Sequence, residues 1–95
     1  VSIEVGMPSG FTLEQNYPNP FNPSTNIKFR ILDGGLVSLK VYDILGNAVT
    51  TLVNEDLDKG EYDFDFSAKG LTSGIYFYKL ETGAFTDTKK MILMK

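Results

Sequence analysis

Clustered carboxylates are the side chains of this sequence with the clearest potential for chemistry. They lie in a polar stretch and in the alternating run that follows it: Glu55, Asp56, Asp58, Glu61, Asp63 and Asp65. Clustered oxygen ligands suit calcium, and paired carboxylates can hydrolyse glycosides. The stretch lacks the Asp-x-Asp-x-Asp-Gly spacing of a calcium loop and contains Lys59, so we favour a solvated acidic face. No cleft is expected around these carboxylates, which argues against a glycosidase.

Other catalytic side chains are missing. The 95 residues contain no Cys, His or Trp, which excludes thiol nucleophiles, imidazole bases, disulfides and Cys/His zinc sites. Ser24, Ser67 and Ser73 therefore have no His partner, and the glycine spacings match neither the P-loop nor the dinucleotide fingerprint. We expect no catalytic residue, no cofactor and no metal ligand in this chain.

Charge and length narrow the class of protein further. The net charge of −3 and the pI near 4.7 argue against a nucleic-acid partner, which would require a basic patch. The longest purely apolar run, 91–94, is far shorter than the ~20 residues of a membrane helix, so no membrane insertion is expected. The chain begins with Val1 and shows no signal peptide, so we expect it to be a fragment of a longer parent protein.

Aromatic residues can fill a core or stack on sugars. The candidates for sugar stacking at the surface are Tyr42, Tyr62 and Phe85. We favour a core position for the aromatic residues Phe29, Phe64, Phe66 and Tyr76. A carbohydrate-binding or adhesive module of a surface hydrolase remains the alternative function.

The elements that must position these side chains are strands. Ile27, Phe29 and Ile31 alternate with Lys28 and Arg30, which is the period of a strand with one apolar face. We expect strands at 11–15, 26–32, 36–43, 48–53, 61–67, 75–81 and 85–94, with loops or turns at 33–35, 45–47, 54–60, 69–74 and 82–83. Seven short strands with regular turns predict an all-β fold, an antiparallel sandwich of two sheets.

For two of these strands, the alternation alone does not decide which face is buried. Strand 75–81 has Tyr76, Tyr78 and Leu80 on one face, and we favour this face for the core because the other carries Lys79. Strand 85–94 is apolar on both faces at 91–94, which predicts that both faces are covered there.

A connector rich in Pro and Asn joins the first two expected strands. Its residues are Asn16, Tyr17, Pro18, Asn19, Pro20, Phe21, Asn22 and Pro23. Proline fixes φ and removes backbone donors, and Asn side chains bond to nearby backbone groups, so the connector should be rigid. We expect Tyr17 and Phe21 to plug one end of the sandwich; the alternative is a preformed recognition loop.

Lysines flank an apolar strand at the end of the chain. The segment comprises Thr88, Lys89, Lys90, Met91, Ile92, Leu93, Met94 and Lys95. One interpretation is an ordinary last strand whose lysines prevent edge aggregation. The other is an exposed address that a partner recognises by adding a strand.

Residues 13–25 closely resemble the opening motif of the type A C-terminal sorting domain of the bacterial type IX secretion system. The resemblance covers 11–95. Its further anchors are Ile27, Phe29, Val41, Tyr42, Asp43, Leu45, Gly46, Thr51, Leu52, Val53, Gly60, Tyr62, Leu71, Ser73, Gly74, Ile75, Tyr76, Lys89, Lys90 and Met91.

The resemblance implies a seven-stranded immunoglobulin-like sandwich, related to a domain of the flagellar hook-capping protein. Such domains end large proteins of gram-negative bacteria, and a signal peptide takes the parent protein across the inner membrane. The type IX outer-membrane machinery then recognises the domain in the periplasm, and a sortase-like peptidase often removes it. Gly6, Pro8, Ser9 and Gly10 predict a linker at 1–10. The resemblance implies a non-catalytic sorting domain at 11–95 read through 88–95, and a secreted or cell-surface parent.

Overall fold

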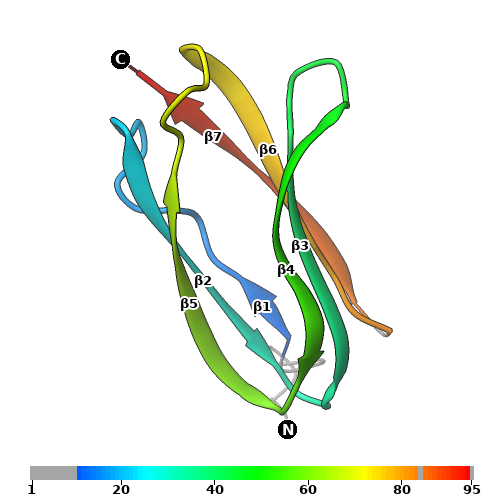
Figure 1. Cartoon of the computed structure of the whole chain (residues 1–95). Coiled ribbons are helices and arrows are strands. Elements are labelled where there is room, and N and C mark those ends of the chain that lie inside the picture. The colour runs from blue at the N-terminus through cyan, green and yellow to red at the C-terminus, as the bar shows by residue number, and fades with distance from the viewer. Residues whose placement is uncertain (1–10, 84, 95) are drawn as a thin grey trace, which may run out of the picture.

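The computed structural model describes residues 11–83 and 85–94. Its strands are β1 (Thr12–Leu13), β2 (Ser24–Ile31), β3 (Gly35–Tyr42), β4 (Ala48–Leu57), β5 (Gly60–Ser67), β6 (Gly74–Glu81) and β7 (Thr86–Leu93). They form a three-stranded sheet in the order β1-β2-β5 and a four-stranded sheet in the order β4-β3-β6-β7. All neighbouring pairs are antiparallel, and the two sheets face each other as layers (Figure 1). The predicted seven-stranded antiparallel sandwich is confirmed.

The core lies between the two sheets and follows the period-two pattern of the strands. β2 contributes Ile27, Phe29 and Ile31, all of them buried, as the alternation predicts. The favoured face of β6 is also confirmed, because Tyr76, Tyr78 and Leu80 are buried. The remaining buried apolar residues are Phe11, Leu13, Phe21, Val37, Leu39, Val41, Phe66, Ala68, Met91 and Leu93.

The prediction of a loop at 54–60 is wrong over most of its length. β4 continues to Leu57, because Asn54 to Leu57 pair with Ser38 to Gly35 of the neighbouring β3. Glu55 and Asp56 therefore lie on a strand instead of in a loop. Pairing with the β3 backbone outweighs the low strand propensity of these polar residues.

The first strand is shorter than expected. The ladder between β1 and β2 covers only Thr12 and Leu13, and the Glu14 amide donates one further bond of 2.9 Å to the Lys28 carbonyl. The chain then enters the Pro/Asn connector. Other strand boundaries differ from expectation by one or two residues, as is usual at the ends of elements.

The turn between β3 and β4 forms around Asp43. The Asp43 carboxylate accepts 2.9 Å hydrogen bonds from the amides of Asn47 and Leu45, and these bonds lower the pKa of its carboxyl group. Gly46 has a φ of +89°, in the left-handed region that glycine adopts without steric cost. The turn expected at 45–47 is thus confirmed.

The expected plug of Tyr17 and Phe21 is half wrong. Phe21 is 2% exposed and belongs to the core, but Tyr17 is 80% exposed. The Tyr17 backbone exchanges hydrogen bonds of 3.0 and 2.9 Å with Asn26, while its neighbour Asn16 is buried. Successive side chains of an extended segment point to opposite sides, so the inward Asn16 directs Tyr17 into solvent.

Most of the expected core aromatics are buried. Phe29, Phe66 and Tyr76 are buried, but Phe64 is only half-buried and packs against the core from its margin. Phe64 lies on β5, which is the edge strand of the three-stranded sheet. The alternation along β5 therefore gave the correct face for Phe64, but its depth of burial was wrong.

Candidate recognition site on the last strand

The last strand, β7, lies at the edge of the four-stranded sheet and pairs with β6 along its whole length. Its inward side chains Met91 and Leu93 are buried, 0% and 1% exposed. On the other face, Thr88 and Lys90 are exposed and Ile92 is half-buried. Met94 is 56% exposed, so the prediction that both faces of 91–94 are covered is wrong. Lys95 lies outside the described residues.

The two neighbouring lysines of this segment have different surroundings. Lys89 is half-buried, and its ammonium group lies 3.9 Å from the carboxylate of Asp87. Lys90 is exposed on the outer face of the sheet. Of the two, Lys90 is the one that presents its charge outward.

The Pro/Asn connector covers the C-terminal half of the outer edge of β7. The Phe21 amide donates to the Ile92 carbonyl and the Phe21 carbonyl accepts from the Met94 amide, both at 2.9 Å. The Asn19 side-chain oxygen accepts from the Ile92 amide at 2.9 Å, and the Gln15 amide group donates to the Lys90 carbonyl at 2.7 Å. We call these contacts of Gln15, Asn19 and Phe21 with β7 the clasp. An edge strand normally leaves such backbone groups open to another chain, and the clasp occupies them here.

A buried polar network anchors the connector itself. Asn16 is 2% exposed, and its side-chain amide donates to the Thr25 hydroxyl at 3.0 Å and to the Pro18 carbonyl at 3.2 Å. The Thr25 hydroxyl donates to the same Pro18 carbonyl at 2.8 Å. Buried polar groups are stabilising when they are paired in this way, so the network holds the connector in one conformation.

Tyr78 of β6 links this network to the four-stranded sheet. Its hydroxyl accepts a 2.7 Å bond from the Asn16 amide and donates a 2.7 Å bond to the Glu14 carbonyl. Burial raises the pKa of Tyr78 to about 12, with a smaller contribution from the negative charge of Asp87. The phenol thus stays protonated at neutral pH and keeps its donor.

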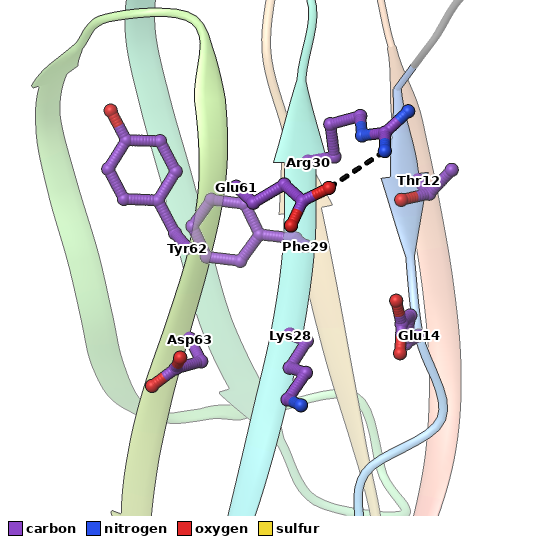
Figure 2. Close-up of a pocket in the computed structure, with 8 residues that line it drawn as sticks. All are labelled: Thr12, Glu14, Lys28, Phe29, Arg30, Glu61, Tyr62 and Asp63. Carbon is purple, nitrogen blue, oxygen red and sulfur yellow. Dashed lines mark hydrogen bonds and ion pairs between the residues drawn. The ribbon is translucent and has the colours of Figure 1, made fainter.

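The carboxylates considered for catalysis lie apart from this site. Glu61 lies on the outer face of the three-stranded sheet, beside a groove of about 450 Å³, and bonds to Arg30 at 2.7 Å (Figure 2). Asp63 lies opposite Lys28 in the register, and Asp65 accepts a 2.8 Å bond from Asn26. These carboxylates belong to a charged and exposed sheet face.

The other groups considered for chemistry are dispersed. Ser24 and Ser67 oppose each other at the end of the β2–β5 ladder, and Ser73 lies in the loop before β6. Within 11–83 and 85–94, no three or more Asp or Glu residues are placed to hold a metal ion. The same residues include no helix long and apolar enough to cross a membrane.

The three aromatic residues proposed for sugar stacking do not form a row. Tyr42 lies on β3 of the four-stranded sheet, whereas Tyr62 lies on β5 of the other sheet and stacks on Phe29 at 5.5 Å. Phe85 stacks on Phe11, also at 5.5 Å. All three are half-buried, and two of them already have a protein ring as their stacking partner.

The sequence matches one family over residues 15–94, described as the secretion system C-terminal sorting domain. The chain belongs to this family. The sorting domain carries the C-terminal signal for type IX secretion, in agreement with the motif at 13–25. Members of the family are sorting signals of larger proteins and act without catalysis, and they direct secretion to the cell surface or beyond. No protein with a curated description matches the chain.

Sequence reasoning missed the groups that hold the site together. Gln15, Thr25 and Tyr78 make hydrogen bonds of the clasp and of the network, yet none of them is predicted as a site residue from the sequence. Asn19 is predicted as part of the connector, but not as an acceptor for the last strand. The available signal is the density of Asn, Pro and Thr at 16–25, which indicates an ordered turn without naming its partner.

Proposed function

We propose that the sorting domain is a preformed address whose last strand, residues 88–95, is read by the type IX outer-membrane machinery. In this proposal the parent protein crosses the periplasm, residues 1–10 link it to the domain, and a sortase-like peptidase acts on the exported product. No side chain of the domain makes or breaks a bond.

One observation supports this proposal most directly. β7 lies at a sheet edge, and the clasp holds it from the other side, so Thr88 and Lys90 stand exposed on a fixed backbone. Binding to an ordered strand costs less conformational entropy than binding to a flexible tail, because the strand is already fixed before the partner binds.

The test is an export assay. Residues 1–95 are fused to the C-terminus of a fluorescent protein that carries an inner-membrane signal peptide, in a host with type IX machinery. We expect fluorescence at the cell surface or in the medium, and periplasmic retention in a host that lacks the machinery. Periplasmic retention in both hosts would refute the proposal.

A matched pair of variants tests the role of the tail. Thr88→Glu with Lys90→Glu places a negative charge at each of the two exposed positions without changing a buried side chain. We expect this variant to remain in the periplasm. Thr12→Glu with Lys28→Glu, at exposed positions of the opposite sheet, serves as the control and should be exported. Equal export of both variants would exclude the exposed side of β7 as the address.

A further inference from the structure

The exposed side chains of β7 belong to a larger surface that continues across β6 and β3. In the register of the four-stranded sheet, Tyr42, Phe77 and Lys90 form one row. A second row, on one side of it, consists of Lys40, Lys79 and Thr88. A third row, on its opposite side, consists of Ile75 and Ile92. All of these point away from the core, because they alternate along each strand with inward side chains that are buried or, beside Thr88 and Lys90, partly half-buried. We call this surface the outer β3-β6-β7 face.

Each cation of the opposite sheet directly faces a carboxylate of that sheet. Arg30 bonds to Glu61 at 2.7 Å, and Lys28 faces Asp63 across the β2–β5 ladder. Figure 2 shows these side chains together around the groove of the three-stranded sheet. Opposite charges at directly facing positions stabilise a sheet, so the cations of this face have favourable neighbours within it.

The charges of the outer β3-β6-β7 face are not matched in this way. Lys40 directly faces Lys79, and like charges at facing positions are destabilising. Lys79 has Glu81 at 3.6 Å, whereas the side chains of Lys40 and Lys90 form no ion pair with any described residue. Unpaired positive charge thus collects on one face of a chain whose net charge is −3.

Apolar side chains lie among these lysines. Ile44, in the turn after β3, is 65% exposed and borders a shallow depression of about 270 Å³. The other residues around this depression are Tyr42, Asp43, Gly46, Phe77, Lys79 and Thr88. Met94 extends the apolar surface at the end of the last strand. Exposed apolar patches that polar residues surround are typical of protein interaction sites.

We propose that the outer β3-β6-β7 face is a docking surface for a protein of the type IX machinery. The matching surface of that partner has an apolar patch surrounded by carboxylates. This inference rests on the proposed function and extends its address from the tail to the adjoining strands. Phe77 and Tyr42 supply the aromatic centre that interfaces favour. Lys40, Lys79 and Lys90 attract an acidic partner and set its orientation.

The experiment uses the export assay with changes outside the tail. Lys40→Gln with Lys79→Gln removes the facing charges, and Phe77→Ser removes one of the two rings of the aromatic centre. Lys28→Gln with Arg30→Gln on the opposite sheet is the control, with an equal loss of charge. We expect the control to be exported like the wild type, and both face variants to be lost from the surface and retained in the periplasm.

The folded state of each variant is measured separately on the purified 95-residue domain. The Lys40/Lys79 change removes a like-charge pair, the partly exposed Lys79–Glu81 ion pair and no core contact. Because exposed ion pairs contribute little to stability, its melting temperature should stay close to that of the wild type. This variant therefore reports on docking even if Phe77→Ser weakens the fold.

The outcomes separate the two proposals. If the wild type itself is not exported, the proposed function fails. If the wild type and both face variants are exported alike, the function stands and the docking surface is refuted. A lipid partner is tested with phosphatidylglycerol vesicles. We expect no sedimentation with the vesicles, and binding that the Lys40/Lys79 change abolishes would overturn the protein partner in favour of a membrane surface.

Discussion

At the scale of single residues, the hydroxyl of Tyr78 connects the two halves of the structure. It bonds to both Glu14 and Asn16, whose backbone groups begin the connector, while its ring fills the core at 0% exposure. Phenylalanine would keep the ring and leave the Glu14 carbonyl and the Asn16 amide without this partner. An unpaired buried polar group costs about 1–3 kcal/mol, and of these two bonds only that of the Asn16 amide is fully buried.

Tyr78→Phe should therefore lower the free energy of unfolding by about 1–3 kcal/mol. Tyr76→Phe is the matched control, because the Tyr76 hydroxyl donates its 2.8 Å bond to Thr72 within a nearby loop. We expect a smaller loss for the control. Urea denaturation of both variants measures the difference, and a larger loss in Tyr76→Phe would contradict the central role of Tyr78.

The raised pKa of Tyr78 makes a second prediction, on pH. The folded pKa of about 12 exceeds the unfolded value of 10, so folding holds the phenol in its protonated form. The stabilising contribution of this group is complete below pH 10 and is lost as the pH rises through 12. In an ultraviolet titration, the wild type should show a tyrosine ionisation near pH 12, and the Tyr78→Phe variant should lack that step.

At the scale of elements, the clasp decides how much of the last strand is open to a partner. Asn19 and Gln15 contact β7 across sequence separations of 73 and 75 residues. Their bonds fill the backbone edge at Lys90 and Ile92. The same edge near Thr88 has no such cover from Gln15, Asn19 or Phe21.

Asn19→Ala should raise the hydrogen-exchange rate of the Ile92 amide, because that amide loses its acceptor. The stability cost should be modest, about 0.5–1.5 kcal/mol, since the bond is exposed. Asn22→Ala is the control, as the exposed Asn22 donates to and accepts from no other described side chain. Equal exchange at Ile92 in both variants would mean that Asn19 does not hold the last strand.

These contacts also mark the limit of prediction from sequence. The alternation of Ile27, Phe29 and Ile31 is sufficient to assign the buried face of β2. Successive side chains of a strand point to opposite faces, so neighbouring residues alone contain this information. The acceptor role of Asn19 depends on two segments meeting in space, and no local pattern encodes that meeting. Likewise, the extension of β4 to Leu57 depends on pairing with β3 and not on its own polar residues.

Burial depth within a strand depends on tertiary context in the same way. Phe64 and Phe66 share one face of β5, yet Phe66 is 5% exposed and Phe64 is only half-buried. We expect Phe66→Ala to cost ~3–5 kcal/mol and Phe64→Ala clearly less, since the cost of removing a ring rises with the depth of its burial. Denaturant unfolding of both variants measures the difference. An equal or larger cost for Phe64→Ala would show that the margin of the sandwich is packed as tightly as its centre.

At the scale of the whole molecule, the proposed address and the core share one strand. Met91 and Leu93 are 0% and 1% exposed in the core, while Lys90 and Met94 lie on the outside of the same segment. A domain of this size has only a modest core and no disulfide to support it. The proposed address and the stability of the fold are therefore coupled in this domain.

Deletion of 91–95 should consequently unfold the domain, because it removes two core side chains and the groups of Ile92 and Met94 that the clasp holds. Each lost core residue costs ~2–5 kcal/mol, which together approaches the ~5–15 kcal/mol that stabilises a typical domain. Circular dichroism and urea titration should show loss of cooperative unfolding in the truncation. Lys90→Gln with Met94→Ser, which changes only outward positions, should retain it. If the truncated domain keeps a cooperative transition, the last strand is dispensable for folding. Loss of export on truncation would then report recognition alone.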